Sequence, residues 1–247
     1  MMTRSNKKLK VLIKNAIISM IGDYDITRLD NDFINSIDFE NNLIVQELIN
    51  FKNLINLNLV KTKITNITNC VNLVNLKIID NQYITELTNL DNLKLLELHN
   101  VPKLKNINLI KIKELKLTNL ESLTTITTGH SLKYLSISNC PLIFNIPSIY
   151  SLTHLYLNDL QLEDISELNN PLEYLEINKC KNLKTIHELN FIKTIKIINC
   201  PNLNTIKYLS DCKSIKIFNC SNLNQIYKFL YCCYLFVKTK FCLLYLN

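Results

Sequence analysis

Glycine is nearly absent from this chain, which has two glycines, five prolines and no tryptophan among its 247 residues. Phosphate-binding loops need several glycines, because their backbone must approach the ligand closely. No Walker-type loop, glycine-rich nucleotide loop or G-x-S-x-G nucleophile motif is present. The scarcity of glycine and proline also leaves no flexible linker, so the composition predicts short turns and one elongated domain.

Arginine is scarce as well, since Arg4 and Arg28 are the only two. A nucleic-acid binder would favour arginine, which makes bidentate contacts with bases and phosphates. The net charge of +7 is spread over the sequence, and solvated lysines account for it. No apolar run approaches the ~20 residues of a spanning helix. Nucleic acid and membrane are therefore not expected partners.

The dominant feature of the chain is a repeat of 19 or 20 residues. The clearest copy begins at Leu172, and it has apolar residues at positions 1, 4, 6, 9, 12, 15 and 18 of the coil. A fixed period of this size is the signature of a solenoid, in which stacked coils share one core. The anchors at position 1 are Ile34, Leu54, Leu73, Leu93, Ile112, Leu132, Leu152, Leu172, Ile192 and Cys212.

Within each coil, the alternation around positions 4 and 6 predicts a short strand with one buried face. Positions 3, 5 and 7 are then exposed. The spacing of three that follows predicts an extended or 3₁₀-like return. Two coils, those at Leu54 and Leu152, place their later apolar residues one position early, which should distort the return and leave the sheet intact.

The pattern L-x-x-L-x-L-x-x-(N/C)-x-x-L resembles the leucine-rich repeat over residues 34–231. The resemblance implies a curved horseshoe with a parallel β-sheet on the concave side and extended or 3₁₀ segments on the convex side. It also implies that position 9 side chains bond to the backbone of the turn. Position 9 holds Asn42, Asn81, Cys140, Cys180, Cys200 and Cys220, with aliphatic departures at Val101, Leu120 and Leu160. Position 8 is often Asn, which indicates a turn after the strand.

The segments on either side of the repeats carry different predictions. In residues 1–33, apolar spacing predicts a helix from about Lys7 to Ile21 that caps the first coil; a secretory signal and a basic amphipathic membrane helix are the alternatives. Residues 232–247 begin a partial eleventh coil at Cys232, Leu235 and Val237. That apolar tail is interpreted as an improvised cap, a docking surface, or the result of truncation within a longer repeat protein.

Nine cysteines and no signal peptide favour a reducing compartment, and the position 9 cysteines are expected to act as small buried hydrophobes. No Cys-x-x-Cys motif or Cys/His set with zinc spacing occurs. His99 and His154 fall three coils apart, about 14 Å by strand spacing, too far to share a metal. No set of groups converges on a catalytic site, so no enzyme activity, cofactor, metal or small-molecule substrate is expected.

The exposed strand positions define the expected binding surface on the concave face. Tyr134, His154, Tyr156 and Tyr174 come from three consecutive coils. Aromatic groups with a polar tip are enriched among interface anchors, although tyrosine also suits exposed strand sites, and both interpretations stay open. Opposite charges at position 5 are expected to pair across strands as a charge ladder, formed by Lys77, Glu97 and Lys116 and by Glu176 and Lys196. A local basic patch includes Lys196 and Lys216 together with Lys193 and Lys213.

The sequence therefore predicts a non-catalytic scaffold that binds another protein through its concave face. The composition and the short irregular repeats resemble leucine-rich repeat proteins of large DNA viruses, such as insect poxviruses, and of protists. That resemblance implies an intracellular protein, in the host cytoplasm if viral, that engages a host protein. The alternatives are a secreted or surface adhesion module of the internalin type, a fragment of a longer leucine-rich repeat protein, and a binder of nucleic acid or anionic membranes through the lysines.

Overall fold

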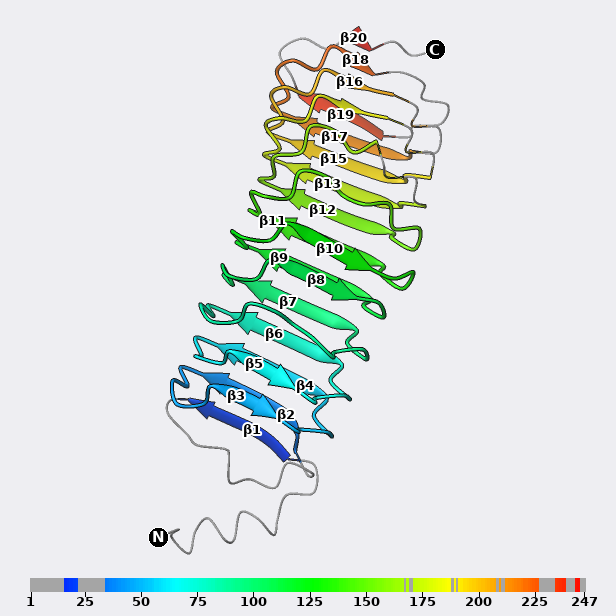
Figure 1. Ribbon diagram of the computed structural model, residues 1–247. Helices are drawn as coiled ribbons and strands as arrows, with labels where there is room; N and C mark the ends of the chain where they lie inside the picture. The colour runs from blue at the N-terminus through cyan, green and yellow to red at the C-terminus, as the bar shows by residue number, and fades with distance from the viewer. Residues whose placement is uncertain are drawn as a thin grey trace, which may run out of the picture.

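The chain forms a parallel β-solenoid in which coils of about 20 residues stack along one axis (Figure 1). A computed structural model describes residues 16–21, 34–166, 168, 171–187, 189, 191–207, 209, 212–226, 234–238 and 243–244. No helix occurs in these residues, and none that could cross a membrane was found among them. The described part of the molecule is therefore built from strands and turns.

One parallel sheet of 12 strands runs the length of the described solenoid. Each strand hydrogen-bonds to the strand of the next coil, so strand order follows chain order (Figure 1). The strands of this main sheet are β1 (Ala16–Ile21), β2 (Ile34–Glu40), β4 (Asn56–Val60), β6 (Asn75–Ile79), β7 (Leu95–His99), β9 (Glu114–Thr118), β11 (Tyr134–Ser138), β12 (His154–Asn158), β13 (Tyr174–Asn178), β15 (Thr194–Ile198), β17 (Ser214–Phe218) and β19 (Tyr234–Lys238).

Within the main sheet, the strands from β4 to β17 cover coil positions 3 to 7, as the period-2 alternation predicts. Positions 4 and 6 are buried, and positions 3, 5 and 7 are mostly half-buried. Neighbouring strands pair without slippage, for example with Leu135 opposite Leu155 and Ile137 opposite Leu157. The two irregular coils also keep their register, because β4 pairs in register with β6 and β12 with β13. The early apolar residues of each coil are therefore accommodated outside the main sheet.

The return side of the coils contains short parallel sheets of its own. Its strands are β3 (Glu47–Ile49), β5 (Asn66–Thr68), β8 (Asn106–Leu109), β10 (Thr125–Thr128), β14 (Thr185–Ile186), β16 (Thr205–Ile206), β18 (Gln225–Ile226) and β20 (Leu243–Leu244). They pair as β3–β5, β8–β10 and β14–β16–β18–β20. In the coils that carry these strands, the return adopts the extended one of the two predicted conformations.

A single apolar core fills the space between the main sheet and the return strands. All the position 1 anchors belong to it, from Ile34, which is 3% exposed, to Cys212, which is 1% exposed. A single coil has only one layer of these side chains and cannot enclose them. Stacking closes the core from above and below, so each coil is stabilised by its two neighbours.

The turn after each main strand has a constant backbone conformation. The residue at position 8 has a φ between 50° and 56° in ten coils, in the left-handed region that Asn and Asp adopt more readily than other non-glycine residues. These residues are Asn41, Lys61, Asp80, Asn100, Asn119, Asn139, Asp159, Lys179, Asn199 and Asn219. The predicted turn at position 8 is confirmed, and it occurs even where lysine replaces asparagine.

Asparagine at position 9 secures the same turn from inside. Asn42 Oδ1 accepts hydrogen bonds from the backbone amides of Ile44 and Val45, at 3.2 and 3.0 Å. Asn81 Oδ1 accepts from Tyr83 and Ile84, both at 2.9 Å. Both asparagines are fully buried. The expected bonding of this column to the turn backbone is therefore confirmed at its asparagines.

The predicted N-terminal helix is wrong where the structure tests it. Residues 16–21 form strand β1, which pairs in parallel with β2, so that Ile18 lies opposite Ile37 and Ile21 opposite Glu40. Short apolar runs fit a helix or a strand equally well. Here the edge of β2 offers unpaired backbone groups, and a strand satisfies them. The remainder of the predicted helix lies outside the described residues.

Candidate functional site

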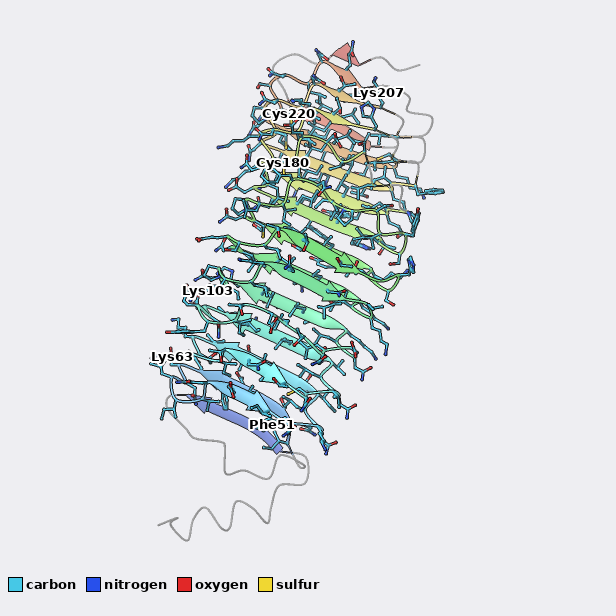
Figure 2. All side chains as sticks on the ribbon, in the orientation of Figure 1. Phe51, Lys63, Lys103, Cys180, Lys207 and Cys220 are labelled. Atoms are coloured by element: carbon cyan, nitrogen blue, oxygen red, sulfur yellow. The ribbon has the colours of Figure 1, made fainter. Side chains whose placement is uncertain are left out.

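The outer face of the main sheet carries the residues that the sequence assigned to binding. In-register stacking places equal coil positions side by side, so positions 3, 5 and 7 form three rows across the sheet. Figure 2 shows the side chains of the molecule along the stacked strands. Neighbouring strands lie about 4.8 Å apart, which is close enough for adjacent side chains in a row to touch.

Three tyrosine rings, those of Tyr134, Tyr156 and Tyr174, form a continuous group on β11, β12 and β13, called here the tyrosine cluster. The ring centroids of Tyr134 and Tyr156 lie 5.0 Å apart, and those of Tyr156 and Tyr174 lie 5.1 Å apart. His154 stacks on Tyr174 at 6.1 Å. These separations fall in the favourable range for aromatic pairs. The structure thus brings all four predicted aromatic residues together.

Charged side chains contact both ends of the tyrosine cluster. The Tyr174 hydroxyl donates to Glu176 Oε2 at 2.8 Å, and Lys196 Nζ donates to Glu176 Oε1 at 2.8 Å. At the other end, Lys116 Nζ lies 5.4 Å from the centroid of the Tyr134 ring. Rings with fixed neighbours lose little conformational freedom when a ligand binds, so the cluster is preorganised.

The surroundings of the tyrosine cluster raise the pKa values of two of its tyrosines and of Lys116 beside it. Partial burial raises the pKa of Tyr174, and the hydrogen bond to Glu176 and its negative charge raise it further. Burial likewise raises the pKa of Tyr134. The hydrogen bond to Glu114 raises the pKa of Lys116. Both tyrosines are therefore neutral donors at physiological pH, and Lys116 is a cation.

The predicted charge ladder is present with one difference. Lys77 pairs with Glu97 across strands at 2.9 Å, and Lys196 pairs with Glu176 at 2.8 Å. Lys116, which stands opposite Glu97 in the register, instead pairs with Glu114 on its own strand at 2.6 Å. Glu114 lies two residues away on the same face, and that position brings Lys116 beside the Tyr134 ring.

The predicted basic patch is partly neutralised by neighbouring carboxylates. Lys193 pairs with Glu173 at 2.7 Å, and Lys196 pairs with Glu176. Lys216 stands opposite Lys196 in the register and is exposed. Lys196 is therefore linked to the tyrosine cluster through Glu176. Lys216 continues the same row towards Phe236, which stands opposite it on β19.

The position 9 cysteines face the core and have structural roles. Cys140, Cys180, Cys200 and Cys220 are free and fully buried, as expected for small apolar side chains. Their thiols lie 3.4–3.7 Å from main-chain oxygens two residues earlier. Burial raises the pKa of Cys140 and Cys180 to about 11. The thiols of Cys140 and Cys180 are therefore poor nucleophiles at neutral pH.

A small cavity lies on the same face nearer the N-terminal end. Its volume is about 210 Å³, and it is lined by residues of β2, β4, β6 and β7, among them Asp38, Asn58 and Lys77. Asn58 Nδ2 donates to Asp38 Oδ1 at 2.7 Å. Asn58 Oδ1 is buried without a hydrogen-bond partner. This oxygen can accept one hydrogen bond from a ligand or from water.

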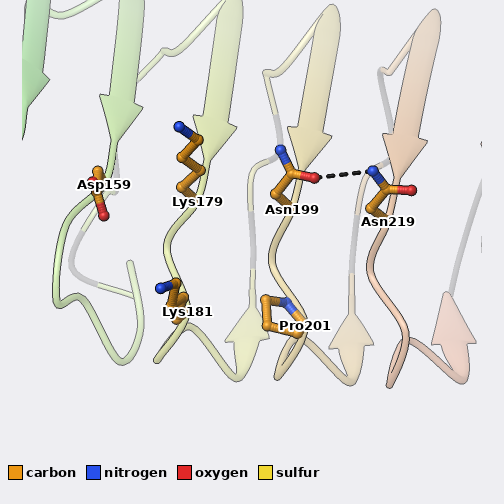
Figure 3. Close-up of a pocket in the computed structure, with 6 residues that line it drawn as sticks. All are labelled: Asp159, Lys179, Lys181, Asn199, Pro201 and Asn219. Carbon is orange, nitrogen blue, oxygen red and sulfur yellow. Dashed lines mark hydrogen bonds between the residues drawn. The ribbon is translucent and has the colours of Figure 1, made fainter.

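A second cavity, of about 490 Å³, lies along the turns that follow the strands (Figure 3). It is open and shallow, and asparagines of two neighbouring coils stand at one end of it. Asn219 Nδ2 donates to Asn199 Oδ1 at 3.0 Å. Its lining is Asp159, Lys179, Lys181, Asn199, Pro201 and Asn219. The lysines are exposed side chains, and the asparagine bonds are part of the coil stacking.

Sequence reasoning missed the residues that hold the aromatic rings. Glu176 and Lys116 had appeared only as charges of the ladder, and their contacts with Tyr174 and Tyr134 depend on side-chain direction. A second aromatic pair, Phe218 and Phe236, lies with centroids 5.3 Å apart at the C-terminal end of the sheet. Phe236 follows Phe218 by 18 residues and stands opposite Lys216, so the two rings are diagonal neighbours on one face of the sheet.

His99 and His154 lie on β7 and β12, which are separated by β9 and β11, so the structure keeps them apart. Among the described residues, no group of three His, Cys, Asp or Glu side chains is arranged to hold a metal ion. In comparisons with known proteins, no family model matches the sequence, and no curated protein sequence matches it significantly. The fold and the site therefore rest on the geometry of this chain.

Proposed function

We propose that the chain is a solenoid of the leucine-rich repeat type that binds a protein partner through the outer face of its main sheet. The observation that carries the proposal is the tyrosine cluster, whose three rings lie 5.0 and 5.1 Å apart on a solvent-facing surface. Tyrosine is a common anchor in protein interfaces, because it buries a large apolar ring and still offers a hydroxyl group.

The assignment to the leucine-rich repeat type is supported by the position 9 side chains. In two coils a buried asparagine bonds to the turn that follows the strand, and in four others a buried cysteine takes its place. The left-handed residue at position 8 recurs beside them. An experimental structure tests this assignment, since a leucine-rich repeat requires the main sheet to line the concave side of a curved array.

The surroundings of the cluster favour a protein over a small molecule. The half-buried rings lie on a sheet face between charged side chains, and these charges extend along the rows on both sides. A small ligand is normally enclosed by its pocket. An extended face with a central aromatic group and a charged surround corresponds to the usual anatomy of a protein interface.

Affinity purification from host-like cells with mass spectrometry tests the proposal. The wild type is compared with a triple variant, Tyr134→Ala, Tyr156→Ala and Tyr174→Ala. The control is the double variant Tyr83→Ala and Phe144→Ala, which removes two exposed aromatic rings outside the cluster. We expect the wild type and the control to recover a partner protein that the triple variant does not recover. All three proteins should melt at similar temperatures. Equal recovery by the wild type and the triple variant contradicts the proposal.

A further inference from the structure

The turns through which the chain enters each main strand form one continuous edge of the solenoid. At this edge, called here the entry edge, the residue at position 2 of one coil hydrogen-bonds through its backbone to the corresponding residue of the next coil. Lys113 N donates to Lys94 O at 2.8 Å, and Lys133 N donates to Lys113 O at 2.9 Å. The side chains of these residues are exposed. The entry edge therefore presents a column of side chains about 4.8 Å apart.

Positive charge is concentrated along the entry edge. Its described residues from Ile55 to Lys213 include six lysines but only two carboxylates, Asp91 and Glu173. The ammonium groups of Lys94, Lys113 and Lys133 on three consecutive coils have no partner among the described residues. Like charges placed directly opposite one another repel. The lysines are Lys94, Lys111, Lys113, Lys133, Lys193 and Lys213.

Exposed apolar side chains stand on the same edge, between the lysines. Ile110 is 68% exposed, Tyr150 is 65% exposed and Phe191 is 60% exposed. Ile55 and Val71 extend the row towards the N-terminal coils, at 41% and 48%. Five large apolar groups projecting from one edge need an explanation, because soluble proteins rarely gather such groups in one place.

We propose that the entry edge binds the surface of a membrane containing anionic lipids. The lysines would contact the headgroups, and the apolar tips would enter the boundary between headgroups and acyl chains. The backbone amides of Lys113 and Lys133 are already bonded to neighbouring coils, so the edge offers side chains and not backbone donors. Ammonium groups and apolar tips suit a fluid surface, which demands no fixed hydrogen-bond geometry.

Other anionic macromolecules fit these side chains less well. Single-stranded nucleic acid is bound by aromatic rings on which bases stack. Three of the five exposed apolar groups, Ile55, Val71 and Ile110, are aliphatic and cannot stack in this way. Peptides usually bind in grooves, and the two cavities described above lie elsewhere, on the outer face of the sheet and along the opposite turns.

Vesicle co-sedimentation tests this proposal with the whole chain. Phosphatidylcholine vesicles are compared with vesicles that contain roughly one-third phosphatidylserine. The wild type is expected to sediment with the anionic vesicles and to remain in solution with the neutral ones. The triple variant Lys94→Gln, Lys113→Gln and Lys133→Gln is expected to partition about a hundredfold more weakly, since each lysine contributes about fivefold.

A control variant with the same change of charge distinguishes the effect of the entry-edge lysines from the effect of a lower net charge. Lys103→Gln, Lys105→Gln and Lys181→Gln remove three exposed lysines beyond the ends of the strands, where Figure 2 shows Lys103 on the opposite edge. This variant is expected to bind like the wild type. A second triple variant, Ile110→Ser, Tyr150→Ser and Phe191→Ser, is expected to lose binding to vesicles while keeping any binding to polyglutamate or to a single-stranded oligonucleotide.

The proposal is overturned if the wild type ignores anionic vesicles, including the case in which it binds only polyglutamate or the oligonucleotide. Equal losses in the two lysine variants would assign the effect to net charge, and full binding by the serine variant would exclude insertion of the apolar tips. Thermal melts followed by circular dichroism establish that the variants are folded. The substituted side chains are exposed, so the melting temperatures should change little.

Discussion

The side-chain amide of Asn81 donates a hydrogen bond to the main-chain oxygen of Ile64 in the preceding coil, at 2.9 Å. The same nitrogen lies 3.2 Å from the main-chain oxygen of Thr62. The amide oxygen accepts from two backbone amides of its own turn. One buried side chain thus joins the turn of its coil to the coil before it.

Replacing this asparagine should destabilise the solenoid. Asn81→Leu leaves several buried backbone groups without partners, and we expect it to lower the free energy of unfolding by about 2–3 kcal/mol. Asn92→Leu is the control, because Asn92 is exposed, donates to the Val71 oxygen and accepts one long hydrogen bond from Lys111 Nζ at the surface. Urea denaturation measures both. A loss at position 81 no larger than at position 92 would show that the buried amide does not stabilise the turn.

The left-handed residue at position 8 predicts whether a substitution by glycine stabilises or destabilises the protein. Lys179 has a φ of 56°, whereas Lys181, two residues later, does not have a positive φ. Lys179→Gly should stabilise the protein by about 0.5–1 kcal/mol, because glycine adopts this conformation without strain. Lys181→Gly should destabilise it by about 0.5–1 kcal/mol through the added freedom of the unfolded chain. Changes of the same sign in urea denaturation would contradict the assigned conformation.

The second glycine of the chain occupies a tight position. A Cβ atom on Gly129 would lie 2.3 Å from the main-chain oxygen of Ile110 in the preceding coil. Gly129→Ala must therefore push two coils apart, and we expect a loss of about 1–3 kcal/mol. Ser131→Ala, two residues later, serves as the control. Similar melting temperatures for both variants would mean that the coils yield easily at this point.

Buried thiols should make stability fall at alkaline pH. Burial raises the pKa of Cys140 and Cys180 from 9.0 to about 11. Below pH 9 these thiols are protonated in both states, so their contribution to stability is complete. Between pH 9 and about 11 the unfolded chain loses protons that the folded chain keeps, and stability falls as the pH rises. We expect the free energy of unfolding, measured by urea denaturation between pH 9 and about 11, to fall less steeply in the double variant Cys140→Ala and Cys180→Ala than in the wild type.

Glu176 should control the acidity of Tyr174. Burial raises the pKa of Tyr174 most, and the Glu176 carboxylate raises it further, because it accepts the hydrogen bond of the hydroxyl and would repel a tyrosinate. Glu176→Gln removes the charge, so the pKa should move back towards the ordinary value. NMR titration of the ring carbon beside the hydroxyl measures the change, with Tyr150 as a distant reference. An unchanged titration of Tyr174 would mean that burial alone determines it.

Much of the fold follows from the spacing of apolar residues, while the N-terminal segment shows where spacing is insufficient. Apolar residues at positions 4 and 6 predict the strands, and their 20-residue recurrence predicts parallel stacking in register. For residues 16–21, the apolar side chains suit a helix as well as a strand, so the pattern does not distinguish the two. The choice depends on the open edge of β2, a partner that a local pattern does not contain.

Some features of the candidate site likewise follow from the repeat, and others depend on the folded chain. The repeat alone determined that Tyr134, Tyr156 and Tyr174 share one face, because equal positions in stacked coils become neighbours. The tertiary structure decided that Lys116 pairs with Glu114 and not with Glu97, and that the Tyr174 hydroxyl bonds to Glu176. A repeat period specifies which residues are adjacent, whereas the direction of each side chain depends on packing and charge around it, which exist only once the coils have stacked.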